Sequence, residues 1–263
     1  KLSQVGLGAN LDIAWHPNSE TFSYVIAEKG QPVLVTVHLD VNSITEKNLF
    51  RIDEVLSLDY SNDGRTIVFS GMINGRSDLY LYRVIGNIQE PLWRDRFDDL
   101  EPRFTDDGNA IIFASNRTDD TLRNDGAYIP FESDLDLFLL HLDKDELEIE
   151  RLLRTPGIDE RNPIPLSNND FIYLSETQDG YQDLMWGWKD STILSIDTIV
   201  KYRYYTDSRV LETQITPSLY LSCDTVNKTI YTTIVKDQTL YNIPTCVMPQ
   251  GNNRSSAMLI NSS

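Results

Sequence analysis

Residues 60–70 and 104–114 of the chain align without a gap at an offset of 44, and this match decides the fold. The first stretch reads Tyr60-Ser61-Asn62-Asp63-Gly64-Arg65-Thr66-Ile67-Val68-Phe69-Ser70. The second reads Phe104-Thr105-Asp106-Asp107-Gly108-Asn109-Ala110-Ile111-Ile112-Phe113-Ala114. In both, an aromatic residue precedes an Asn/Asp/Gly turn, and an apolar run follows the turn. An offset of 45 in the other direction brings Trp15 onto Tyr60, Phe22 onto Ile67 and Tyr24 onto Phe69.

Further copies of the unit start near Ser167 and Asp224, so five units are readable. Each unit contains a short strand, the polar turn, an alternating strand, a second turn and another alternating strand, with a fourth strand leading onward. The second turns contain Lys29-Gly30, Asn74-Gly75 and Asp179-Gly180, which favour hairpins. A four-stranded repeat of about 40–45 residues is typical of a β-propeller. A meandering β-sandwich is the alternative, but recurrence in register favours the propeller.

We therefore predict an all-β chain, a β-propeller of four-stranded antiparallel blades. Five blades are readable, and terminal strands would make six. The predicted propeller domain covers residues 1–248, and residues 249–263 form a polar C-terminal tail. Closing the ring would require residues near Lys1 to Gly8 to complete the sheet of the last blade, since an open sheet edge invites aggregation.

One family resembles these repeats. The stretch from Glu101 to Gly108, continuing through Ser115-Asn116-Arg117 to Asp136-Leu137-Phe138, is similar to the TolB-type propeller repeat. The resemblance is strong between residues 50 and 185. It extends to large TolB-like proteins of bacterial envelopes, which the segment around Lys201 to Tyr205 resembles. The resemblance implies a periplasmic or outer-membrane-associated propeller that works through protein contacts, such as with an envelope lipoprotein or a secretion or transport complex.

The charge balance excludes some partners. The formal net charge is −17 and the sequence pI is about 4.5. Such a chain repels phosphate backbones, so nucleic acid and anionic membranes are poor partners. No stretch approaches the ~20 apolar residues that span a bilayer. No secretory signal is visible, and we treat the chain, which begins at Lys1, as a mature or trimmed piece.

Acidic pairs recur where one unit passes to the next. Two carboxylates follow an apolar residue in three units, and the pairs are Asp53-Glu54, Asp98-Asp99 and Asp159-Glu160. These crossovers should lie around the axial opening, on the same face as the second turns. One interpretation is structural: the acids bond to backbone amides, with the arginines at 51, 96 and 161 as partners. The other is an acidic rim that binds a basic partner or a cation. Apart from such a cation, we expect no cofactor.

The third unit contains about 16 extra residues, Thr118 to Ser133, where the other units have a tight hairpin. Loops carry function more often than strands do, and exposed aromatic residues anchor interfaces. Candidate contact residues in this insertion are Asp119, Asp120, Tyr128 and Phe131. Packing of the same aromatics back onto the blade is equally consistent with the sequence. If the loop is functional, deleting residues 118–133 leaves the fold intact and abolishes partner binding.

No catalytic motif is recognisable, so we expect no enzyme activity and nominate no catalytic or metal-ligating residue. The three histidines (His16, His38 and His141) fall at turns or strand ends, where structural roles are expected. Cys223 and Cys246 belong to elements separated by one strand, about 9–10 Å apart, whereas a disulfide needs Cα atoms within about 7 Å. Their pairing therefore requires the 245–250 turn to fold inward, and thiol titration of the denatured, unreduced protein would decide it.

The sequence thus predicts a non-catalytic protein-binding scaffold of the bacterial cell envelope, which engages its partner through the loop-rich acidic face. The alternatives are a substrate-gating propeller of a larger peptidase-like protein and a carbohydrate-active propeller enzyme. A fused hydrolase domain in the full-length gene product would favour gating, whereas a neighbouring lipoprotein or transport system would favour a scaffold.

Overall fold

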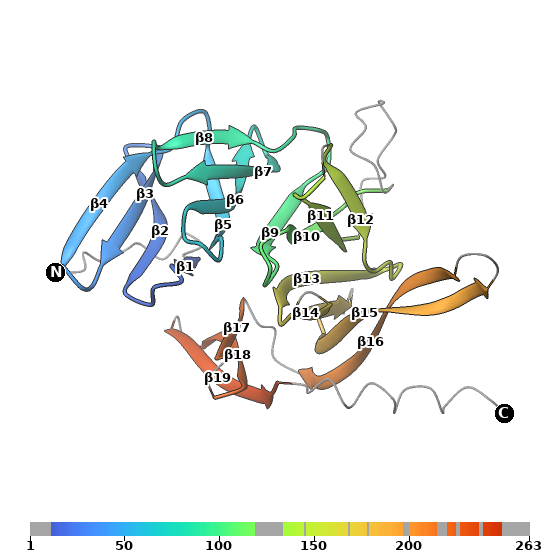
Figure 1. Ribbon diagram of the computed structural model, residues 1–263. Coiled ribbons are helices and arrows are strands. Elements are labelled where there is room, and N and C mark those ends of the chain that lie inside the picture. The colour runs from blue at the N-terminus through green and yellow to red at the C-terminus, as the bar shows by residue number, and fades with distance from the viewer. Residues whose placement is uncertain are drawn as a thin grey trace.

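The computed structural model describes residues 12–118, 134–144, 146–167, 169–177, 179–196, 200–214, 220–224, 227–236 and 239–248. These residues form five antiparallel sheets arranged as the blades of a propeller (Figure 1). The predicted all-β propeller is confirmed. Within the described ranges there is no helix long and apolar enough to cross a membrane. A sixth blade stays a prediction, because residues 1–11 and 249–263 lie outside the described ranges.

Four of the sheets have four strands in sequence order. Blade 1 contains β1 (Ile13–Trp15), β2 (Thr21–Glu28), β3 (Gln31–His38) and β4 (Ser43–Asn48). Blade 2 contains β5 (Glu54–Tyr60), β6 (Thr66–Ile73), β7 (Arg76–Arg83) and β8 (Ile88–Pro91). Blade 3 contains β9 (Asp99–Phe104), β10 (Ala110–Ser115), β11 (Asp136–His141) and β12 (Glu148–Arg151). Blade 4 contains β13 (Ile158–Pro165), β14 (Asp170–Thr177), β15 (Gln182–Ile196) and β16 (Val200–Gln214).

Blade 5 has three strands among the described residues: β17 (Tyr220–Asp224), β18 (Thr229–Lys236) and β19 (Thr239–Val247). The register pairs Cys223 with Ile230 on β18, and Ile230 with Cys246 on β19. The β18 strand therefore lies between the two cysteines, as strand placement predicted. The side chain of Cys246 lies outside the described residues. Thiol titration therefore remains the test of a disulfide between Cys223 and Cys246.

The first strand of each blade is innermost, and successive inner strands touch: β1 with β5, β5 with β9, β9 with β13 and β13 with β17. The core is divided into four apolar clusters, one between each pair of neighbouring blades. The β10 strand shows how this arises. Ile111 and Phe113 pack toward blade 2, whereas Ile112 and Ala114 pack toward blade 4, so an unbroken apolar run buries both faces of the strand.

The turns have the conformations that their sequences favour. Lys29-Gly30 and Asn74-Gly75 connect second to third strands with all four residues at positive φ, between 52° and 78°. This is the type I′ geometry, whose twist matches that of the strands it joins. The turns between first and second strands, such as Asp63-Gly64, open on the opposite end of each blade. His16 packs beside Gly64, where a Cβ atom would lie 2.0 Å from its Nε2, and its ring meets Tyr60 edge-on.

Candidate partner-binding surfaces

The first acid of each crossover pair accepts a backbone amide. Asp98 accepts the amide of Ser77 at 3.0 Å, and Asp159 accepts the amide of Leu135 at 2.8 Å. Ser77 and Leu135 both lie at the start of the third strand of the preceding blade. Asp98 and Asp159 therefore join consecutive blades, as the structural interpretation of the acidic pairs expects.

Asp53 differs because its equivalent partner would be Pro32, which has no N–H to donate. The register offset of 45 between β3 and β7 places Pro32 where Ser77 lies in the next blade. Asp53 instead accepts the amide of Asn74 at 2.7 Å, within its own blade. Asp53 and Glu54 are both exposed, so this crossover presents its carboxylates to solvent.

The second acids of the other two pairs are buried. Asp99 is 0% exposed and accepts hydrogen bonds from Ser115 Oγ at 2.7 Å and from the Arg117 guanidinium at 2.7 Å. Arg117 also binds Asp95 at 2.7 Å, and its guanidinium lies over the rings of Trp93 and Phe97. Burial raises the pKa of Asp99 to about 7, although Arg117 opposes this shift.

Glu160 is 1% exposed at the crossover into blade 4. The Thr155 hydroxyl donates to its Oε1 at 2.6 Å. Burial raises the pKa of Glu160 to about 7, with the Thr155 hydrogen bond opposing and the nearby Asp136 adding to the shift. Glu160 and Asp99 are therefore internal groups, and a partner at the surface would not reach them.

Three of the described acids lie close enough together to be a candidate cation site. Asp78, Asp95 and Asp99 place carboxylate oxygens within 4.8 Å of one another. The Arg117 guanidinium bonds to Asp95 and Asp99 and supplies the positive charge that these carboxylates need. The cluster therefore fits a buried arginine better than a metal ion. A cation at the acidic rim stays a prediction for the exposed pair, Asp53 and Glu54.

The arginine partners differ from those that the sequence indicated. Arg161 pairs with Glu101 at 3.0 Å, and Glu101 also accepts the amide of Asn162 at 2.6 Å. These contacts join the inner strands β9 and β13, where a β-bulge gives Glu101 and Asn162 positive φ. Arg103 on β9 likewise reaches Asp12 at 3.3 Å. Charged side chains near the axis thus bind one another.

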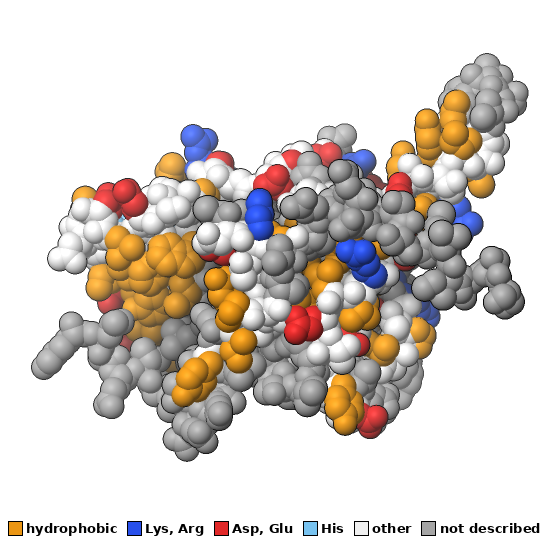
Figure 2. Space-filling model, turned by 90° about the horizontal axis from the view of Figure 1, so that it is seen from below, with side chains coloured by type: hydrophobic (Ala, Val, Ile, Leu, Met, Phe, Trp, Pro, Cys, Tyr) orange, Lys and Arg blue, Asp and Glu red, His pale blue; other side chains and the backbone are white. Residues whose placement is uncertain are grey.

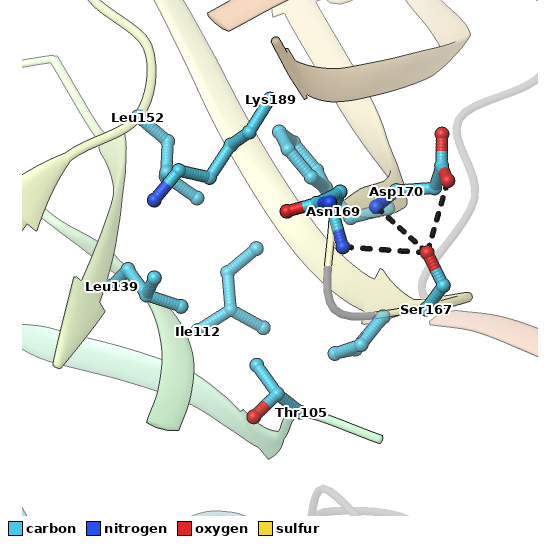
Figure 3. Close-up of a pocket in the computed structure, with 10 residues that line it drawn as sticks. Thr105, Ile112, Leu139, Leu152, Ser167, Asn169, Asp170 and Lys189 are labelled. Atoms are coloured by element: carbon cyan, nitrogen blue, oxygen red, sulfur yellow. Dashed lines mark hydrogen bonds between the residues drawn. The ribbon is translucent and has the colours of Figure 1, made fainter. Parts of the chain in front are cut away.

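Two inter-blade clefts open on the face that carries the turns between first and second strands. A cavity of about 360 Å³ lies between blades 2 and 3, lined by residues that include Asp63, Leu81, Phe104, Asp107 and Leu142. We call this the open cleft. The equivalent space between blades 3 and 4 measures only about 20 Å³ and is shown in Figure 3. We call this the filled cleft, because Lys189 extends across it.

A long hairpin projects from blade 4 (Figure 1). The β14 strand pairs with β15 only as far as Trp188, so Lys189–Ile196 and Val200–Thr206 continue as a two-stranded ribbon. The ribbon carries an exposed apolar stripe of Ile193, Leu194, Val200, Tyr202 and Tyr204, in which Ile193 pairs with Tyr202 and Leu194 lies at a bulge. Figure 2 shows hydrophobic side chains gathered on this arm, and a second group over blade 1, where Trp15 is 57% exposed.

Four of the candidate residues in the insertion, Asp119, Asp120, Tyr128 and Phe131, lie outside the described residues. Their position relative to the crossover acids therefore lies outside the description as well. Of the crossover acids, it buries Asp99 and Glu160, half-buries Asp98 and Asp159, and exposes Asp53 and Glu54.

The comparisons with known proteins concern the fold. No protein-family model and no curated protein matches the chain. Among solved structures, TolB from Acinetobacter baumannii matches with a TM-score of 0.61 at 14% identity, over 89% of this chain and 51% of that chain. A putative TolB from Agrobacterium tumefaciens matches with a TM-score of 0.54 at 13% identity, over 76% and 74% of the two chains.

The β-propeller domain of the trilobed protease from Pyrococcus furiosus is also similar, with a TM-score of 0.51 at 10% identity, over 90% of this chain and 84% of that chain. The chain spans about half the length of the A. baumannii TolB. At these identities the likeness concerns architecture, and it agrees with the repeats that resembled TolB in sequence. The chain therefore has the fold of a TolB-like β-propeller.

Proposed function

We propose that the chain is a non-catalytic protein-binding scaffold of the bacterial cell envelope. The observation that carries this proposal is the ribbon of β15 and β16, which extends an apolar stripe away from the propeller. Tyr204 is 71% exposed, Leu194 is 64% exposed and Tyr202 is 52% exposed. An isolated two-stranded hairpin is marginally stable in water, and a partner that covers the stripe would stabilise it.

The stripe also has the composition of an interface. Tyrosine is among the residues that contribute most to binding energy, because it offers a large apolar surface together with a hydroxyl group. Exposed contiguous apolar patches mark interaction sites more often than single exposed residues do. The ribbon side chains come from one continuous hairpin, so they can contact a partner together.

The acidic crossover face provides a second proposed contact. Asp53 and Glu54 face solvent there, and the partner that they favour is basic. The envelope location rests on the resemblance to TolB in sequence and fold. Enzyme assays test the proposed absence of catalysis and the carbohydrate-active alternative. The domain content of the full-length gene product tests the gating alternative.

The test compares two exposed-aromatic variants of the full chain. Tyr202→Thr/Tyr204→Thr removes the aromatic surface of the stripe while keeping β-favouring residues, and Phe50→Thr is the matched control at a residue that is 68% exposed elsewhere. Each variant is cross-linked in the native envelope, and the captured proteins are quantified against the unmodified chain. We expect the double variant alone to lose a specific partner. Equal capture by all three proteins would overturn the role of the ribbon.

A further inference from the structure

The open cleft and the filled cleft occupy equivalent places in consecutive blades. Leu81 and Leu139 are equivalent residues of the third strands, and each lines its cleft. Leu142 and Lys189 are equivalent too. Each comes directly after the residue that pairs with the first residue of the second strand, and each donates its amide to the residue before that strand at 2.8 Å. The two clefts therefore share these two positions of the framework, and at the second of them one cleft has leucine and the other has lysine.

In the filled cleft, Lys189 shows how a basic side chain fits the framework. Its stem extends toward Leu139 and Leu152 (Figure 3), and only 21% of the side chain is exposed. Its ammonium binds Glu150 on the outer strand β12 at 2.7 Å. A long aliphatic stem that covers apolar surface, with its charge held by a carboxylate at the end, is the usual way in which lysine is partly buried.

An acid equivalent to Glu150 lies beside the open cleft, next to Leu81 of its lining, but no lysine is present at the equivalent of position 189. Glu90 pairs with Leu81 across the strands, as Glu150 pairs with Leu139, so Glu90 is the equivalent acid. Arg83 binds Glu90 at 2.6 Å, just as His141 contacts Glu150 at 3.4 Å beside Lys189. Leu142 stands where Lys189 would be and leaves about 360 Å³ empty.

Two carboxylates, Asp63 and Asp107, line the open cleft itself. Hydrogen bonds from the amide of Arg65 and the hydroxyl of Ser61 lower the pKa of Asp63. Burial opposes but does not cancel the hydrogen bonds from Asn109 and Thr105 that lower the pKa of Asp107. Both groups are therefore ionised at neutral pH. Arg65 lies 4.0 Å from Asp63 with a largely exposed side chain, which makes this a weak pair.

We propose that the open cleft between blades 2 and 3 binds a lysine side chain of a partner polypeptide. The stem of this lysine lies on Leu81, Phe104 and Leu142, and its ammonium reaches Glu90 and Asp63. The proposal rests on the protein-binding function proposed above, but it concerns a site separate from the ribbon. It also names the chemistry that the partner presents.

The experiment uses the full chain with labelled leucine methyl groups and the peptide acetyl-Gly-Ser-Lys-Ser-Gly-amide. We expect the methyl signals of Leu81 and Leu142 to shift and saturate as the peptide is added. The same peptide with Nε-acetyl-lysine keeps the stem but has no charge, and it should give no saturating shift. Equal shifts with the two peptides would overturn the proposal.

Three variants locate the lysine. Glu90→Gln and Asp63→Asn keep an acceptor oxygen and should each weaken binding about two- to five-fold, which is the range for partly exposed ion pairs. Leu142→Lys places the chain's own lysine in the cleft and should abolish the Leu81 shift. The control, Glu28→Gln/Asp40→Asn, lowers the net negative charge by two at exposed sites away from the cleft and should bind unchanged. Equal weakening in this control would show a general charge effect and overturn the site.

The ribbon variant separates the two proposals. Tyr202→Thr/Tyr204→Thr leaves the open cleft intact, so it should shift Leu81 as the unmodified chain does. If Leu142→Lys fails to fold, as its methyl spectrum would show, Glu90→Gln and Asp63→Asn decide the outcome. No weakening in either of these two variants would overturn the proposal.

Discussion

At the scale of single residues, a few buried charged side chains are the positions where a substitution should cost the most stability. Arg117 is 2% exposed and binds Asp95 and Asp99, which are also buried. A buried ion network of this kind adds little net stability compared with apolar residues of the same shape. Loss of one member, however, leaves an uncompensated charge, which costs about 3–5 kcal/mol. The crossover into blade 3 therefore depends on Arg117.

Glu160 gives a pH-dependent prediction. Burial raises its pKa from an ordinary 4.5 to about 7, so between these values the folded chain binds more protons than the unfolded chain. Glu160 therefore lowers the free energy of unfolding as pH rises through this window. Glu160→Gln should raise the free energy of unfolding by about 2–3 kcal/mol at pH 8 and by nearly nothing at pH 4, measured by urea denaturation. A gain that is independent of pH would contradict this explanation.

The sequence showed the acidic pairs and allowed a structural interpretation of them, in which the acids bond to backbone amides. It did not predict which of the acids would be buried. That outcome depends on neighbouring blades. Asp98 accepts the amide of Ser77, whereas the equivalent position facing Asp53 is Pro32, which has no N–H. The partner of Asp99 is Arg117 on the same blade, which stands 18 residues away in sequence. Such pairings follow from the register between blades, and a single repeat does not reveal it.

At the scale of elements, the repeat predicted strands and turns well because each strand has both its own alternation and a matching turn. The apolar run that follows the Asp63-Gly64 turn is β6, which extends from Thr66 to Ile73. The ribbon was less predictable, since its length beyond the blade depends on where the neighbouring strand β14 stops pairing. The residues of the ribbon alternate like those of a strand inside a blade. The sequence therefore does not show that β14 no longer pairs with β15 there.

The distal ribbon should contribute little to the stability of the propeller. Asp190 pairs with Tyr205, so residues 191–204 can be replaced by an Asn-Gly turn that closes the hairpin there. We expect the free energy of unfolding to change by less than about 1 kcal/mol, since the removed side chains are mostly exposed. Urea denaturation measures this. A larger loss would mean that the ribbon packs on the propeller in solution.

For the whole molecule, the sequence predicted the propeller because apolar residues on both faces of a short strand require a neighbour on each side. The four apolar clusters lie between successive blades, as this argument requires. The open cleft was not predictable, because the repeats do not show which side chains fill the space between two blades, such as Leu142 in one and Lys189 in the next. Only the equivalence of Leu142 and Lys189 in space makes the difference visible.

Pro32 has a consequence for how the propeller comes apart. A carboxylate–amide tie joins blade 2 to blade 3 and blade 3 to blade 4, but the missing N–H of Pro32 denies blade 1 the same tie to blade 2. Structures built from units that contact only their neighbours can open one unit at a time. In native-state hydrogen exchange, we expect amides of β2 and β3 to lose protection at lower denaturant than those of β10 and β11. Simultaneous loss would indicate that the five blades open as one cooperative body.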